Sequence, residues 1–210
     1  MIIDKSLFAQ YDIAKLVKGT VVPRAVAWTS TISEEGIRNL APFSFFTVAS
    51  LDPVIFCISI SPGSDADKTG DKDTLANIRA TGEFVINIVS ESQANQMHET
   101  SKNHRKNVDE FQKAGLPAAS SKLVVAPRVL GAPVNMECKL NRVIAVGRNY
   151  LVLGRLVCYH IREDVYIKGD KINYQALQPI GRMAGDYTYV REFFELPHPD
   201  LPVKDSGSVT

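Results

Sequence analysis

Short apolar runs with two-residue alternation recur along the chain, and polar turns separate them. These runs predict strands over residues 24–32, from 37 onward, and over 53–60, 84–89, 134–146, 150–161 and 165–167. Residues 33–36 form a polar turn ending in glycine, which favours a hairpin between the first two strands. In run 53–60, alternate apolar positions predict a core face, whereas Cys57 and Ser59 leave the opposite face small and polar.

Helical patterns are short and few. Residues 73–80 read as a helix, with Asp71 or Asp73 as its cap and Gly82 just beyond its end. Ser90 and Gln93 have the spacing of a capping box for a second helix running to about residue 100, and 108–114 predicts a third. Strands and helices do not alternate regularly, so we expect a mainly β protein, an antiparallel barrel with short peripheral helices.

The length of 210 residues fits one domain, which we place at 1–195. The stretch 196–210 holds three prolines and then small polar residues, which predicts an extended carboxyl-terminal arm or tail. With 45% hydrophobic and 22% charged residues, the chain can bury a sizeable core and reads as soluble rather than membrane-spanning.

Charge and cysteine content narrow the function classes further. A net charge of +1 gives no long-range field for nucleic acid or an anionic membrane. The amino terminus lacks the pattern of a secretory signal, so we expect a cytoplasmic location. Cys57, Cys138 and Cys158 are odd in number and form no C-x-x-C, which predicts buried reduced thiols rather than disulfides or a zinc site.

Two stretches could meet a ligand. Residues 39–46 (NLAPFSFF) place a proline, a serine and three aromatics directly after a turn, where a simple strand would alternate. Residues 68–74 set Lys68, Lys72, Thr69 and Thr74 before a helix whose amino-terminal N–H groups favour an anion. The alternative for 68–74 is a solvated charged loop with an aspartate cap, which these residues alone favour.

Other polar and aromatic residues near the first hairpin stay open to two interpretations. Taken alone, the hydroxyls of Ser30, Thr31 and Ser44 are more often structural than functional. Trp28, the only tryptophan, fits either the core or a stacking contact with a ligand.

Taken together, these stretches resemble the flavin reductase-like family of FMN-binding split barrels. The resemblance is carried, in order, by residues 23–31 (PRAVAWTST), 39–46, the run Lys72-Asp73-Thr74 with Asn77, and 82–85 (GEFV). Residues 136–138, 154–157 with His160, and 182–185 continue it.

The resemblance implies an antiparallel split β-barrel that forms a homodimer, with FMN at the subunit interface. It implies that the flavin is lined by Trp28, Thr29, Ser30, Thr31, Asn39, Ala41, Pro42, Phe43, Ser44 and Phe45. Lys72 and Thr74 would hold the phosphate, with Lys68 an alternative to Lys72, and Asn77 and Ser59 would complete the site. The stretch 39–46 is then a ledge for the ring, where Pro42 breaks the strand ladder.

The chain has no G-x-G-x-x-G after a strand, so NAD(P)H would dock directly over the flavin rather than on a Rossmann domain. The resemblance thus predicts hydride transfer from NAD(P)H to flavin, and electron transfer onward to free flavin, ferric complexes or a partner oxygenase. The flavin would carry the chemistry, so no side chain need act as acid, base or nucleophile. His160 is the candidate contact to the hydride donor, and its alternative is a structural histidine.

Two other functions remain open. The chain could be a flavin-binding electron carrier without nicotinamide activity. It could also bind another flat phosphorylated ligand, as the similar pyridoxamine-phosphate oxidase barrels suggest, or serve structurally. We assign His98 and His104 to the surface, because six residues of separation does not place them on one helix face for a metal.

Overall fold

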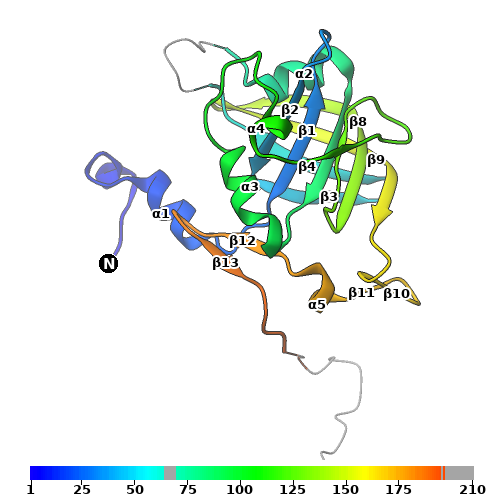
Figure 1. Ribbon diagram of the computed structural model, residues 1–210. Helices are drawn as coiled ribbons and strands as arrows, with labels where there is room; N and C mark the ends of the chain where they lie inside the picture. Colours follow the sequence, from blue (N-terminus) through cyan, green and yellow to red (C-terminus); the bar gives the residue numbers. More distant parts are fainter. Residues whose placement is uncertain (64–69, 195, 197–210) are drawn as a thin grey trace, which may run out of the picture.

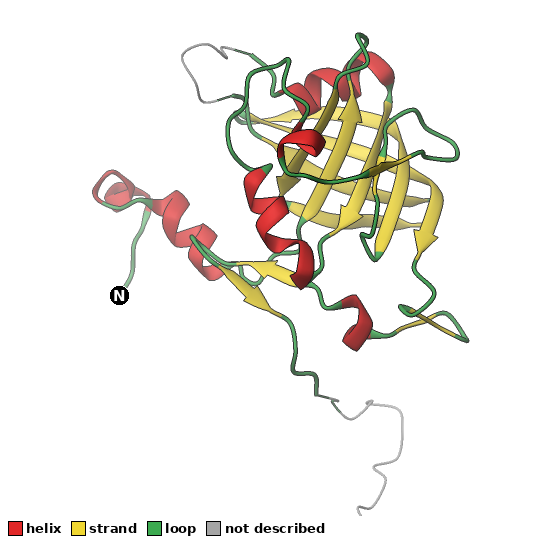
Figure 2. Cartoon of the chain, viewed as in Figure 1, coloured by secondary structure: helices red, strands yellow, loops and turns green. Residues whose placement is uncertain are grey.

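Seven antiparallel strands form one continuous sheet in the computed structural model, which describes residues 1–63, 70–194 and 196 (Figures 1 and 2). The strand order is β2-β1-β5-β8-β9-β4-β3. The strands are β1 (Ala27–Ile32), β2 (Arg38–Phe43), β3 (Phe46–Leu51), β4 (Val54–Ile60), β5 (Glu83–Ile88), β8 (Val134–Val146) and β9 (Asn149–Ile161). The mainly β, antiparallel architecture predicted from the pattern is confirmed.

The two edges of this sheet meet at one short connection. β2 and β3 stand at opposite ends of the strand order, yet only Ser44 and Phe45 separate them in the chain. The N–H of Ser59 on β4 donates to the carbonyl of Phe45 across 2.8 Å, so the connection is held against the body of the sheet. The sheet therefore curls until its edges adjoin, and we call residues 43–46 the seam.

The first hairpin forms where the pattern predicts it. β1 and β2 pair from Ala27 opposite Phe43 to Ile32 opposite Arg38. At the turn, Gly36 adopts a φ of 83°, a conformation that a residue with a Cβ atom rarely takes. The prediction that Pro42 breaks the ladder is wrong, because Pro42 lies opposite Trp28 and β2 continues to Phe43. β2 is an edge strand, where a missing N–H group is tolerated.

The core lies inside the curled sheet. Phe56, Ile58 and Ile60 of β4 are buried, whereas Cys57 and Ser59 between them are half-buried, as the alternation predicts. Phe84 of β5 packs directly over Gly154 of β9, where an added Cβ atom would lie 2.1 Å from the Phe84 ring. Only glycine fits at residue 154, because cores of this density leave no spare volume.

Short helices pack against the sheet, with α3 and α4 across β2 and α2 at the end of the barrel against β1, β2 and β5 (Figure 1). They are α2 (Asp73–Thr81), η2 (Glu91–Gln93), α3 (Ala94–Glu99) and α4 (Glu110–Lys113). A second apolar cluster, which includes Trp28, Leu40, Met97 and Phe111, fills the space beneath α3 and α4, whereas Leu75 and Ile78 of α2 belong to the core inside the sheet. No helix among the residues the structure describes is long and apolar enough to span a membrane.

Two helix caps differ from the sequence prediction. α2 ends at Gly82 with a φ of 70°, as predicted, but its N-cap is Lys72 rather than Asp71 or Asp73, and it makes no side-chain cap bond. Asp71 instead pairs with Arg79. The capping box at Ser90 is also wrong, because the chain there makes the 3-10 turn η2 and the Ser90 hydroxyl bonds the Ser92 hydroxyl.

Peripheral elements flank the barrel. They are η1 (Lys5–Gln10), α1 (Ile13–Thr20), β6 (Ala118–Ala119), β7 (Arg128–Val129), β10 (Tyr166–Ile167), β11 (Lys171–Ile172), α5 (Tyr174–Leu177), β12 (Ile180–Arg182) and β13 (Tyr187–Tyr189). Of these, the sequence pattern predicted only β10, within the run 165–167. The predicted boundary at 195 and the tail 196–210 fall, apart from Leu196, outside the described residues.

Arg24 connects α1, near the amino terminus, with the β12–β13 hairpin. The Arg24 guanidinium is buried and donates to the carbonyls of Lys18 and Val21 at the end of α1, over 2.6 and 2.8 Å. It also donates to the carbonyl of Met183, beyond β12, over 2.7 Å. The main chain of Arg24 pairs with that of Arg182 as well, so α1 and the β12–β13 hairpin share one anchor.

Candidate functional site

A buried polar network centres on Asn39 of β2. Its side-chain oxygen accepts from the hydroxyls of Thr31 (3.1 Å) and Thr74 (2.8 Å), and its amide donates to a Glu110 oxygen over 3.2 Å. The Asn77 amide donates to the Thr31 hydroxyl over 3.0 Å. We call these five residues the Asn39 network, and four of them were predicted from the sequence to belong to one site.

The start of α2 explains this convergence. Thr74 and Asn77 are three residues apart, so both lie on the helix face that packs over β1 and β2. The first turn of a helix leaves N–H groups without intrahelical partners, and the helix dipole is positive there. Lys72 stands at this end beside Asp73, so an amine and the free N–H groups of the helix lie next to the Asn39 network.

A hollow of about 80 Å³ opens beside the network. Ala41, Pro42 and Phe43 of β2 line one side of it, and polar residues that include Lys72, Thr74, His104 and Glu110 line the rest. A drug-sized ligand usually occupies about 300 to 1,000 Å³. Within one chain the hollow therefore holds only part of such a ligand.

A neighbouring hollow of about 320 Å³ shares Pro42 with the first. Ser44, His98, Arg182 and Tyr187 are also among its lining residues. Pro42 thus stands between a hollow beside the cationic end of α2 and a hollow beside the seam. A long molecule with an anionic end could lie along β2 and reach both.

The side chains of the seam are held loosely compared with the network. The Ser44 hydroxyl accepts from Arg24 Nε over 3.4 Å. Phe45 is 45% exposed, with the Arg24 guanidinium 5.7 Å from its ring centroid. Both side chains therefore remain accessible to a partner molecule.

The predicted residues of β1 behave differently. Trp28 is fully buried and its indole N–H donates to the Thr100 hydroxyl over 2.9 Å, which makes it a core residue. Thr29 and Ser30 are fully buried as well, and Ser30 donates to the carbonyl of Pro127 over 2.5 Å. All three residues are fully buried, and their main chain pairs with β2 on one side and β5 on the other, so within one chain none of them is open to a ligand.

Ser59 and His160 lie away from both hollows. Ser59 on β4 accepts from the Asn149 amide over 3.0 Å and lines neither hollow. His160 on β9 contacts Glu137 and lines a separate hollow with Arg128 and Arg162, which shares no residue with the other two. A contact between His160 and the predicted ligand would need a second copy of the chain. The predicted alternative Lys68 lies outside the described residues.

Sequence reasoning missed Glu110. It is 6% exposed at the start of α4, and it accepts from the Leu40 N–H over 3.2 Å as well as from Asn39. Burial raises the pKa of this carboxyl to about 7, although its hydrogen bonds act in the opposite direction. No spacing motif marks Glu110, because its role depends on how α4 packs on β2.

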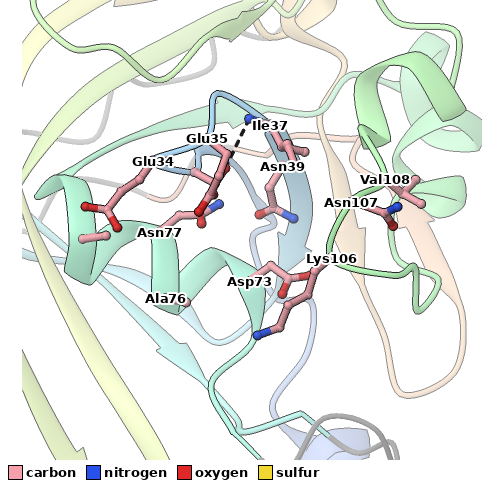
Figure 3. Close-up of a pocket in the computed structure, with 12 residues that line it drawn as sticks. Glu34, Glu35, Ile37, Asn39, Asp73, Ala76, Asn77, Lys106, Asn107 and Val108 are labelled. Carbon is pink, nitrogen blue, oxygen red and sulfur yellow. Dashed lines mark hydrogen bonds between the residues drawn. The ribbon is translucent and has the colours of Figure 1, made fainter.

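A third hollow, shown in Figure 3, lies on the other side of α2 and measures about 460 Å³. Glu34 and Glu35 of the hairpin turn and Asp73 of α2 line it, and Lys106 extends beside Asp73. Three carboxylates oppose the binding of a phosphate here. Asp73 also lines the hollow beside Asn39, together with Glu110, but Lys72 and Lys102 balance these carboxylates there, so that hollow suits the predicted phosphate better.

The three cysteines form no disulfide. Cys138 is buried, and burial raises the pKa of its thiol well above the usual range. Cys57 and Cys158 are only half-buried, so the prediction of buried thiols holds for one of the three. Burial also raises the pKa of the Cys57 thiol, which keeps that residue in its neutral form.

The curled antiparallel sheet with a hollow beside β2 fits the split barrel that the sequence resemblance implies. The family model described as flavin reductase like domain matches residues 19–177, and the chain belongs to that family. A protein of Aquifex aeolicus is 41% identical over 181 residues, covering 86% of this chain and 90% of that protein.

Solved structures agree with the family. Nitrilotriacetate monooxygenase component B from Bacillus cereus superposes with a TM-score of 0.87 at 33% identity, covering 93% of this chain and 98% of that one. The 2-nitrobenzoate 2-nitroreductase of Pseudomonas fluorescens superposes with a TM-score of 0.83 at 29% identity, covering 96% and 98%. The predicted family and the split-barrel fold class are both confirmed.

Proposed function

We propose that this protein is an FMN-binding oxidoreductase of the flavin reductase type, which takes hydride from NAD(P)H and passes electrons to a second acceptor. The observation that carries the proposal is the convergence of the Asn39 network, the cationic start of α2 and the apolar wall of β2 around one hollow. A bound flavin would supply the redox chemistry, and the chain would bind and orient it.

The residues present fit the parts of FMN. Lys72 and the N–H groups at the start of α2 would hold the phosphate, as helix amino termini do for anions. The hydroxyl proton of Thr74 is already donated to Asn39, so Thr74 would serve through its main chain. Pro42 and Phe43 would form the flat apolar wall for the ring, and Ser44 would offer a hydroxyl at its far end.

We further propose a homodimer with the cofactor at the subunit interface. The small volume of the hollow beside Asn39 within one chain supports this arrangement. Apolar side chains next to the seam support it too, since Phe45 is 45%, Val48 50% and Leu51 79% exposed. A second copy would cover these side chains, and sedimentation velocity of the wild type and of Val48→Asp would show whether the dimer uses β3.

The electron donor and acceptor are proposals of the same kind. NAD(P)H would reach the flavin from the open side of the hollows, and this supply suits a cytoplasmic location. The name of the Bacillus cereus relative, a monooxygenase component, supports a partner oxygenase as acceptor. The name of the Pseudomonas fluorescens relative, a nitroreductase, supports testing a nitroaromatic compound besides free flavin and ferric complexes.

The visible absorbance spectrum of the purified protein, followed by anaerobic addition of NADH and then NADPH, tests the proposal. A flavin spectrum that either nucleotide bleaches is the expected result. A flavin that dithionite and a reduced carrier protein bleach, but neither nucleotide, would replace the reductase with an electron carrier. A protein that takes up no added FMN would overturn the cofactor assignment.

A further inference from the structure

A second polar cluster lies on the sheet away from the Asn39 network. Glu137 of β8 is directly opposite Cys158 of β9 in the strand register, and His160 follows Cys158 by two residues. Side chains two residues apart share one face of a strand, so all three point to the same side. One ligand atom from each of the three lies within 4.8 Å of the other two. We call these residues the Glu137 cluster.

The three side chains already share one hydrogen-bonding centre. His160 Nε2 lies 2.5 Å from Glu137 Oε1 and 3.4 Å from Cys158 Sγ. A single proton on this nitrogen would face both a carboxylate oxygen and a sulfur. A metal ion can occupy such a position, because imidazole nitrogen, thiolate and carboxylate are the three side-chain ligands that zinc uses.

Groups behind the cluster hold the carboxylate in place. Glu137 is fully buried, and its two oxygens accept the N–H groups of Lys122 (2.7 Å) and Leu123 (2.6 Å). Hydrogen bonds of this kind orient ligands in metal sites. Tetrahedral zinc needs ligand atoms about 3.3 Å apart, so the nitrogen must move away from the Glu137 oxygen by less than about 1 Å. The His160 side chain is 25% exposed and can make this movement.

Charge and access also suit a dication. A carboxylate, a thiolate and a neutral imidazole together balance the charge of one divalent ion. Arg128 and Arg162 line the adjoining hollow, but Arg162 is paired with Asp164 and Arg128 donates to the Ser120 carbonyl and to Asn135. That hollow, of about 570 Å³, leaves room for water as a fourth ligand.

We propose that Glu137, Cys158 and His160 form a binding site for one zinc-like divalent metal ion per chain, separate from the flavin site. Binding releases the thiol proton of Cys158 to solvent and takes His160 as the neutral imidazole with its proton on Nδ1, so that Nε2 is free to bind the ion. The sequence alone predicted no zinc site, because neither C-x-x-C nor paired histidines are present. The site arises from strand register instead.

The test is a titration of the reduced, chelator-treated protein with Zn²⁺ in competition with a chromophoric chelator. Wild type is expected to bind one ion per chain. Cys158→Ser and His160→Gln should weaken binding by at least about 10- to 100-fold, the range seen even for residues that only support a ligand. Cys57→Ser is the matched control, since Cys57 is also half-buried but lies outside the cluster.

Two further readouts keep the proposal testable if a variant folds poorly. With Co²⁺ as the probe, a thiolate charge-transfer band in the difference spectrum should appear for wild type and Cys57→Ser only. In wild type, Zn²⁺ should protect Cys158, and not Cys57, from alkylation followed by mass spectrometry. A wild type that binds no Zn²⁺, or a Cys158→Ser variant that binds it equally well, overturns the proposal whatever the outcome of the flavin experiments.

Discussion

The Asn39 network and the Glu137 cluster each centre on a buried residue of an antiparallel strand, but they are built from different chemistry. The first joins amides and hydroxyls, whose charge does not change, and Glu110 is its one ionisable member. The second consists wholly of ionisable groups around one nitrogen atom. A neutral network fixes the shape of a hollow, whereas an ionisable cluster can exchange its protons for a cation.

Asn39→Ala should have the largest effect, because Asn39 is the centre of its network. The hydroxyls of Thr31 and Thr74 and the carboxyl of Glu110 would lose a partner, and each unsatisfied buried group costs about 1 to 3 kcal/mol. We expect a loss of about 3 kcal/mol or more in the free energy of unfolding, measured with urea, together with loss of FMN binding. Asn141→Ala, at an exposed position, is the control; equal stability of the two variants would contradict the central role of Asn39.

Glu110 gives the Asn39 network a pH dependence that its neutral members lack. Because the pKa is raised from 4.5 to about 7, the folded state binds a proton more tightly than the unfolded state. Between pH 4.5 and about 7, the folded state holds more protons than the unfolded state. The free energy of unfolding therefore falls as pH rises through this range, by roughly 3 kcal/mol at most.

Glu110→Gln should remove most of this slope, since its amide oxygen can still accept from Leu40 and Asn39. Urea unfolding at pH 5 and pH 8 measures the difference for both proteins. An identical slope in the variant would show that the carboxyl is already ionised at the lower pH.

Lys72→Ala should weaken FMN binding with a smaller effect on stability, because the Lys72 side chain makes no cap bond to α2. A charge-assisted hydrogen bond contributes about 1.5 to 3 kcal/mol, so we expect roughly 10- to 100-fold weaker binding in a fluorescence titration. Riboflavin, which lacks the phosphate, should lose much less affinity. Lys106→Ala, in the acidic hollow of Figure 3, is the matched control; an equal loss there would point to general charge rather than a phosphate seat.

His160→Gln should have the smallest effect on folding. The glutamine amide can still donate to Glu137, which also keeps its bonds from Lys122 and Leu123. We expect a loss of about 1 kcal/mol or less in urea unfolding. His160→Leu leaves the carboxylate with one donor fewer and should cost more. Equal stability of these two variants would show that the histidine bond adds nothing to folding.

The sequence predicted best where local pattern and packing agree. The first hairpin, the run 53–60 and the end of α2 at Gly82 follow from alternation and from one glycine. α1 was missed although the sequence carries its signals, since the Asp12 side chain caps its first turn and its apolar residues gather on one face. The predicted capping box at Ser90 is wrong because the chain there forms a 3-10 turn rather than the first turn of an α-helix.

The same limit applies to the sites. Thr31, Asn39, Thr74 and Asn77 could be grouped because a family resemblance carries them in order. Glu110 could not be assigned to the same site from the sequence, because its position depends on how α4 packs on β2. The Glu137 cluster depends on the register of β8 and β9, which shifts at a bulge beside Glu137. No turn motif or residue spacing in the sequence predicts this bulge.

Arg24 also couples the local unfolding of two segments of the molecule. Its guanidinium holds the carbonyls of residue 18 and residue 183, so segments far apart in the chain depend on one side chain. Such shared dependence makes two segments a single cooperative unit of local unfolding. Amide hydrogen exchange in α1 and in the β12–β13 hairpin should therefore follow one opening equilibrium, and both ends of the chain should become accessible to proteases together.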